Sequence, residues 1–195
     1  MTITLGCIVE GHGEVQAVPR LVHRIAAEVS PGTVVVTPAP LRRPRGTLVK
    51  AAEFERHVQL MARKVGPGGG VLVLLDADDD CPADLGPSLL RRAIDLRHDL
   101  KISVVVAKME FEAWFLAAAR SLAGVCGLPA DLQPPDAPES IRAAKSWLSQ
   151  RMDRPYSPTV DQAALVGAMD LAAARAADSF DKCYRDISAM LRSTA

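Results

Sequence analysis

The sequence lacks an excess of charge of either sign. Its 195 residues include 23 Lys and Arg and 23 Asp and Glu, so the formal net charge is zero. Global charge therefore does not predict a nucleic-acid partner, although a local basic patch still can. Apolar residues make up 49% of the chain, which is a normal fraction for a globular protein. The length suits one domain, with or without a helical extension.

The sequence also lacks the patterns typical of paired cysteines, of a signal peptide and of a membrane span. Its cysteines are scattered, without a CxxC pair or a zinc-binding spacing to histidine, so we expect free thiols in a reducing compartment. The N-terminus has no basic segment followed by an apolar core, and we therefore expect no signal peptide. No apolar run approaches the ~18 residues of a membrane helix. These absences favour a cytoplasmic protein without a membrane partner.

Two nucleotide-binding motifs are missing. The chain has no GxxxxGK[ST] phosphate loop, because the glycine-rich stretch at 66–70 is not followed by the required lysine. The "GHG" at 11–13 does not continue as GxGxxG, because Gln16 stands at the third glycine position. If an ATPase takes part in the function, we expect it to be a separate protein.

The first part of the chain alternates between apolar runs and amphipathic segments. Short apolar or β-branched runs predict strands at 3–9, 33–37, 71–75 and 102–107. Apolar residues at helical spacing predict helices at 15–29, 54–65, 85–96 and 110–123. Strands alternating with helices imply parallel pairing through helical crossovers. We therefore expect an α/β fold with a doubly wound, mostly parallel sheet of about four strands.

The sequence changes character after residue 124. A proline-rich connection at 127–138 precedes two spacings typical of capping boxes, one in Asp136 and Glu139 and the other in Thr159 and Gln162. We expect each to begin a helix, and a last amphipathic helix to follow. The predicted organisation is an α/β domain at 1–124 and a helical extension at 125–195, packed on it as one compact unit.

Acidic residues follow three of the predicted strands. In chain order they are Glu10 and Glu14, then Asp76, Asp78 and Asp80, then Glu110 and Glu112. The carboxyl ends of parallel strands meet at one edge of the sheet, where sites form, and alternate residues of an extended segment share one side. Carboxylate oxygens are the ligands that magnesium prefers, and two such ions can act in phosphodiester cleavage. Taken singly, each cluster also fits a solvated turn or a helix start.

A basic loop follows the second predicted strand. It holds Arg42, Arg43, Arg45 and Lys50, and cationic side chains beside carboxylates suit the backbone of a nucleic acid. The alternative is a solvated loop without a ligand. His12, in the glycine turn, is a candidate phosphate contact or base, and a polar residue in a flexible turn is its alternative.

These residues together resemble a TOPRIM-type domain, the fold of primases, topoisomerases and the overcoming-lysogenization-defect (OLD) nucleases. That superfamily has a glutamate after its first strand and an Asp-x-Asp after its third, which Glu10, Asp76 and Asp78 match. Glu14 is similar to an acidic residue of the OLD-like variant. A closer resemblance is to the domain of unknown function 4276, through "VEGHGE", "LDADD", "FEAWFLA" and "SFDK", and it covers nearly the whole chain.

The resemblance implies roles for these side chains. Glu10, Asp76 and Asp78 would be catalytic, with Glu10 a metal ligand or an acid–base group. The full set of expected ligands for Mg²⁺ or Mn²⁺ is Glu10, Glu14, Asp76, Asp78, Asp80 and Glu112, with Glu110 as the rival of Glu112. OLD-like nucleases also carry a late lysine near the phosphate, which would be Lys145 or Lys182.

The expected function is a Mg²⁺-dependent nuclease or nicking enzyme that acts on phosphodiesters. The resemblance implies a DNA substrate and a role in DNA repair or phage defence with a separate ATPase partner. Two alternatives stay open at this point. One is a non-catalytic TOPRIM-like adaptor in such a complex. The other is a metal-dependent glycosyltransferase, whose Asp-x-Asp would not require Glu10. The oligomeric state does not follow from the sequence.

Overall fold

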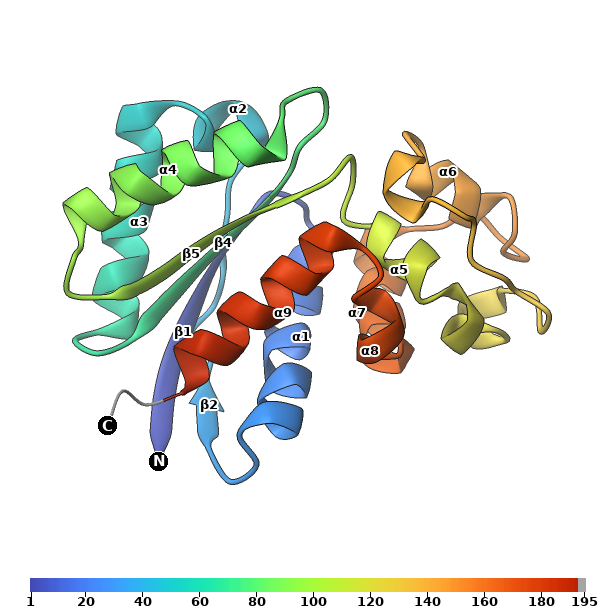
Figure 1. Ribbon diagram of the computed structural model, residues 1–195, viewed down its shortest axis with the longest axis horizontal. Coiled ribbons are helices and arrows are strands. Elements are labelled where there is room, and N and C mark those ends of the chain that lie inside the picture. Colours follow the sequence, from blue (N-terminus) through green and yellow to red (C-terminus); the bar gives the residue numbers. More distant parts are fainter. Residues whose placement is uncertain (193–195) are drawn as a thin grey trace.

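A parallel β-sheet forms the centre of the computed structural model, which describes residues 1–192 (Figure 1). Its order is β2-β1-β4-β5, and a short β3 also pairs with β1. The strands are β1 (Thr2–Val9), β2 (Val34–Val36), β3 (Leu41–Arg42), β4 (Gly70–Asp76) and β5 (Lys101–Ala107). All pairs are parallel. The predicted α/β class and the four predicted strands are confirmed, and β3 is additional.

The central strands are apolar throughout because helices cover both faces of the sheet. On one face, side chains of β1 such as Cys7 share a core with α1 (Glu14–Val29) and α9 (Asp178–Leu191). On the other face, Ile8 packs with α3 (Ala51–Val65) and α4 (Pro82–Leu96). Figure 1 shows these two pairs of helices on opposite sides of the strands. Strands that are covered on both faces lose the alternation of apolar and polar residues.

The predicted helix at 110–123 is wrong in its extent. The helix is only α5 (Ala113–Ala117), and a 3₁₀ turn at Ala119–Leu122 follows it. Met109 before it has a left-handed backbone with φ of 65°, so the chain turns sharply after β5. The turn is anchored where the N–H of Phe111 donates to Asp76 Oδ1 at 2.8 Å. These constraints delay the start of the helix.

Both predicted capping boxes are wrong. Glu139 lies in a 3₁₀ turn and instead accepts hydrogen bonds from Asp178 N and Ser179 N of α9, each at 3.0 Å. Gln162 donates to a buried glutamate of another segment. Before α9, the tail contains α6 (Ala144–Ser149), α7 (Pro158–Ala168) and α8 (Leu171–Ala174). A further short helix, α2 (Arg45–Leu48), precedes α3 in the first part of the chain.

The tail shares the core of the sheet face that carries α1. Leu165 of α7 and Phe180 of α9 belong to the same buried cluster as Leu5 of β1. Figure 1 shows α5 to α8 gathered beyond the carboxyl end of β5, and α9 returning beside α1. The boundary at residue 124 stays a prediction, but the packing brings tail residues to the edge of the sheet where the acidic residues lie.

Two further expectations concern the whole chain. All four cysteines, Cys7, Cys81, Cys126 and Cys183, are free thiols. Within residues 1–192, no helix combines the length and the apolar character needed to cross a membrane.

Candidate carboxylate site

A cavity of about 360 Å³ lies at the carboxyl ends of the neighbouring strands β1 and β4. Side chains of both halves of the chain line it. Its charged or titratable lining residues are Glu10, His12, Glu14, Asp76, Glu112 and Lys145. The cavity therefore brings together four of the predicted metal ligands, which are Glu10, Glu14, Asp76 and Glu112. It also contains His12, a candidate phosphate contact, and Lys145, one of the two candidate lysines. Such a gathering is expected where neighbouring parallel strands end.

The turn after β1 is held by hydrogen bonds between acidic residues and backbone. Glu14 Oε2 accepts from the N–H of Glu10 at 3.0 Å, and Glu10 Oε2 accepts from the N–H of Asp76 at 3.3 Å. Gly13 allows the close approach of the tail, because a Cβ there would lie 2.3 Å from the carbonyl oxygen of Pro158. The "GHG" turn therefore joins β1, β4 and the tail.

Glu112 is the most buried acid of the cavity, with no exposed surface. Its Oε1 accepts from Tyr156 Oη at 2.9 Å and from Gln162 Nε2 at 3.3 Å. Its Oε2 lies 2.8 Å from Lys145 Nζ in an ion pair. The rival Glu110 lies in a neighbouring pocket with Asp78. Glu112, and not Glu110, faces the cavity.

Lys145 provides a positive charge inside the acidic cluster. Its Nζ lies 2.8 Å from Glu112 Oε2, 3.5 Å from Glu110 Oε1 and 3.8 Å from Asp76 Oδ2. Burial by itself lowers the pKa of the Lys145 ammonium, but the charge and hydrogen bonding of Glu112, with smaller contributions from Asp76 and Glu110, raise it above its ordinary value. Lys145 therefore stays protonated.

The carboxylates outnumber this single ammonium. Burial raises the pKa of Glu14 from 4.5 to about 7, and the charges of Glu112 and Glu10 add to the effect. Burial also raises the pKa of Glu10. The pKa of Asp76 is raised well above its ordinary value by burial and then by the charge of Glu14. The cavity therefore holds four carboxyl groups and one ammonium, and the raised pKa values mean that protons neutralise part of these acids when no further cation is bound.

Asp78 and Asp80 do not join the cavity. Asp78 has a left-handed backbone with φ of 49°, which ends the alternation expected over 76–80. Its Oδ2 lies 3.1 Å from Arg45 Nε, and Asp80 forms a short ion pair with the same guanidinium. Asp79 pairs with Arg142 at 2.8 Å. Of the predicted aspartates, only Asp76 lines the cavity.

The predicted basic loop is largely engaged inside the protein. Arg45 donates to the carbonyl oxygens of Asp76 and Ala77, each at 3.0 Å, so it fixes the aspartate turn. Arg43 Nε donates to His57 Nε2 at 2.6 Å. The other two basic residues of the loop, Arg42 in β3 and Lys50 before α3, do not line the cavity either. Their nucleic-acid role stays a prediction.

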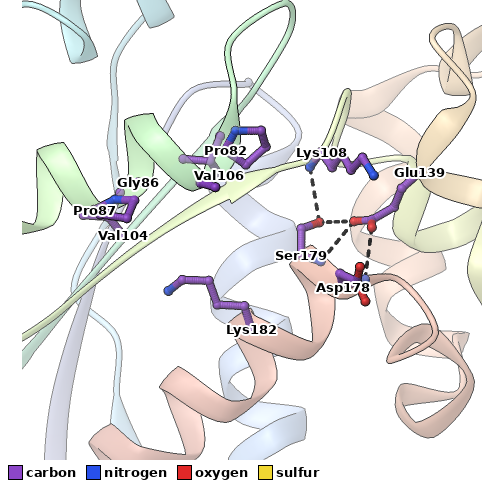
Figure 2. A pocket seen from close by; sticks show the side chains of 11 residues that line it. Pro82, Gly86, Pro87, Val104, Val106, Lys108, Glu139, Asp178, Ser179 and Lys182 are labelled. Carbon is purple, nitrogen blue, oxygen red and sulfur yellow. Dashed lines mark hydrogen bonds between the residues drawn. The ribbon is translucent and has the colours of Figure 1, made fainter.

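Lys182 lies in a different cavity of about 240 Å³, between α4, β5 and α9. Figure 2 shows it apart from the hydrogen-bonded group at the start of α9. In that group Ser179 Oγ accepts hydrogen bonds from Trp114 Nε1 at 2.8 Å and from Lys108 N at 3.2 Å. The same hydroxyl donates a hydrogen bond to Glu139 Oε1. Lys182 itself pairs with Asp186. The "SFDK" segment therefore ties α9 to the sheet, and Lys145 is the lysine at the carboxylates.

Sequence reasoning missed the uncharged residues that the tail contributes. Tyr156 and Gln162 bind Glu112, and Pro158 and Thr159 line the same cavity. The spacing of Gln162 from Thr159 is that of a capping box, which predicted a different role for Gln162. No periodic pattern marks Tyr156, because its partner lies 44 positions away in the chain.

The protein thus belongs to the parallel α/β class and carries a buried cluster of carboxylates and a lysine at one edge of its sheet. The sequence matches the family described as a domain of unknown function (DUF4276) over residues 9–187, and the chain belongs to that family. The matched range includes every residue of the carboxylate cavity. No curated protein and no solved structure matches the sequence.

Proposed function

We propose that this protein is a divalent-metal-dependent phosphodiesterase, a nuclease or nicking enzyme of the TOPRIM-like type. The observation that carries the proposal is the cavity in which Glu10, Glu14, Asp76 and Glu112 meet with a single lysine. A cluster of hard oxygen donors that lacks balancing positive charge is suited to Mg²⁺ or Mn²⁺. The resemblance of Glu10 and Asp76 to the TOPRIM pattern also supports the proposal, whereas the second aspartate of that pattern, Asp78, faces Arg45.

The carboxylate oxygens of the cavity suit a divalent metal chemically, but one side chain must move before they can bind it. Within residues 1–192, no three acidic, histidine or cysteine side chains are arranged around one point as ligands. Lys145 Nζ instead lies between Glu112 and Asp76. Asp76, Glu10 and Glu112 would hold the ion after this ammonium moves toward Glu110. Asp78 and Asp80 would serve only if Arg45 released them.

The residues of the cavity have distinct roles in this proposal. A bound divalent ion supplies a water of lowered pKa and stabilises charge on the phosphate. Glu10, whose pKa is raised by burial, can exchange a proton with the attacking water. Lys145 would neutralise a phosphate oxygen, and His12 would contact the phosphate as a hydrogen-bond donor. A DNA substrate, a separate ATPase partner and a role in repair or phage defence rest on the resemblance to OLD nucleases alone.

One observation favours a second candidate, the non-catalytic adaptor. The three ion pairs of Lys145 already give the buried carboxylates an internal cation, which is what a structural cluster requires. The glycosyltransferase alternative needs Asp76 and Asp78 to share a metal, and Asp78 is turned toward Arg45. It gains no support from the arrangement.

The test is incubation of the purified protein with labelled single- and double-stranded DNA and RNA in Mg²⁺ or Mn²⁺. Asp76→Asn removes a charge from the cavity and should abolish cleavage. Asp95→Asn, which alters an exposed residue of α4, is the matched control and should cleave as the wild type does. Cleavage that persists in Asp76→Asn would contradict the proposal. Absence of both cleavage and metal binding would favour the adaptor.

A further inference from the structure

We infer that Tyr156 is a positioning residue of the carboxylate cavity, which holds one oxygen of Glu112 and thereby directs the other toward a bound cation. This inference rests on the proposed metal-dependent function and extends it. It assigns to the C-terminal part of the chain a role in the site, because Tyr156 lies between α6 and α7.

The geometry of Glu112 carries the inference. Its Oε1 receives two hydrogen bonds, from Tyr156 Oη at 2.9 Å and Gln162 Nε2 at 3.3 Å. Both donors come from the tail, and two hydrogen bonds use the usual acceptor capacity of one carboxylate oxygen. Oε2 is left to face Lys145 Nζ at 2.8 Å, on the side of the cavity. One carboxylate thus has one oxygen bound to the protein and one turned toward a cation.

The tyrosine is itself held in a fixed position. Its backbone N–H donates to Ser149 Oγ at 3.0 Å. After it, the N–H of Ser157 donates to Asp161 Oδ2 at 2.8 Å, and Arg154 donates to the same oxygen at 2.9 Å. Asp161 is 1% exposed. These bonds tie the segment that precedes α7 to the first turn of that helix, so Tyr156 meets Glu112 from a defined direction.

Packing alone does not explain the hydroxyl group. Tyr156 is 8% exposed and belongs to the apolar cluster around α1, where a phenylalanine would contribute the same ring. The hydroxyl donates to Glu112, a buried carboxylate that lines the cavity together with three other acids. The same cavity also contains Gln162 Oε1, which is buried and has no hydrogen-bond partner within residues 1–192. Partners that orient ligating carboxylates change metal affinity about 10–100-fold.

The chain offers a matched control in its second tyrosine. Tyr184 Oη also donates to a glutamate, Glu28 Oε2, at 3.1 Å. That pair lies on the exposed side of α1 and α9, and its acceptor Glu28, unlike Glu112, does not line the carboxylate cavity. Tyr184→Phe therefore removes a tyrosine hydroxyl group and the same type of hydrogen bond without affecting a residue that lines the cavity.

The experiment is a calorimetric titration of the full chain with Mn²⁺. Tyr156→Phe should bind Mn²⁺ about 10–100-fold more weakly than the wild type, and Tyr184→Phe should bind it equally. Mn²⁺ should also change the near-ultraviolet tyrosine absorption of the wild type and of Tyr184→Phe, and should leave that of Tyr156→Phe unchanged. A purely structural tyrosine would show no such spectral response.

The outcomes separate this inference from the proposed function. If the wild type binds no Mn²⁺, the metal-dependent function fails, and the inference fails with it. If the wild type binds Mn²⁺ and Tyr156→Phe binds it equally well, only the positioning role is overturned. Binding by the wild type without any change in tyrosine absorption also overturns it, and this result does not depend on whether Tyr156→Phe folds.

Discussion

Glu14 should make the stability of the metal-free protein depend on pH. Its side chain is 4% exposed, and burial, assisted by the charges of Glu112 and Glu10, raises its pKa from 4.5 to about 7. Because this pKa is higher in the folded state than in the unfolded state, folding is favoured by protonation of Glu14. Its contribution to stability is fully present below about pH 4.5 and is lost as the pH rises through 7.

The magnitude follows from the two pKa values. The difference between 7 and 4.5, at about 1.4 kcal/mol for each pH unit, corresponds to about 3 kcal/mol. Glu14→Gln removes the titration and keeps an acceptor for the N–H of Glu10. In urea unfolding with a chelator, the stability of the wild type relative to Glu14→Gln should fall by about 3 kcal/mol between pH 4.5 and 8.

The control is Glu28→Gln, which changes an exposed residue of the same helix and should retain the wild-type pH profile. Added Mg²⁺ should reduce the difference between the wild type and Glu14→Gln at high pH, because a bound cation stabilises the ionised carboxylates. Parallel pH profiles for the wild type and Glu14→Gln without metal would mean that the pKa of Glu14 is not raised in the folded protein.

Three further substitutions test the architecture of the site. Lys145→Met leaves the buried Glu112 without its ammonium and should lower the stability by about 1–3 kcal/mol. Mg²⁺ should restore part of this stability in thermal unfolding, and no recovery would count against a cation site. Gly13→Ala places a Cβ 2.3 Å from a carbonyl oxygen of the tail. It should lower the stability by about 1–3 kcal/mol and therefore lower the melting temperature. The control Gly46→Ala, whose Cβ would have nothing within 4 Å, should not lower the melting temperature. Ser179→Ala removes the hydrogen-bond acceptor of the buried indole of Trp114 and should lower the stability in urea unfolding by about 1–3 kcal/mol. An unchanged near-ultraviolet circular dichroism spectrum would contradict the hydrogen bond between Trp114 and Ser179.

The fold was predictable from the sequence because its central strands are short apolar runs. Strands buried on both faces need apolar residues throughout, and the helices between them show one apolar face each. The two-residue β3 could not be predicted, because two residues are too few to show a periodic pattern of apolar side chains. The helix expected at 110–123 was too long, since the left-handed Met109 and the anchored turn after β5 leave no sequence signal.

Part of the site was predictable for a simple topological reason. Glu10 follows β1 and Asp76 ends β4, and because these strands are parallel neighbours, both residues had to lie at the same edge of the sheet. Asp78 escaped prediction because a left-handed backbone at a residue other than glycine reverses the side-chain direction that alternation implies. Tyr156 and Gln162 escaped because their contacts with the cavity depend on how the tail folds back over the sheet.

A crystal structure with Mn²⁺ would show whether the carboxylate cavity binds a divalent metal. We expect an anomalous scattering peak within reach of Asp76, Glu10 and Glu112, with the ammonium of Lys145 displaced from Glu112. A crystal at saturating Mn²⁺ that shows no peak in the cavity, with Lys145 still paired to Glu112, would mean that the cavity is not a metal site.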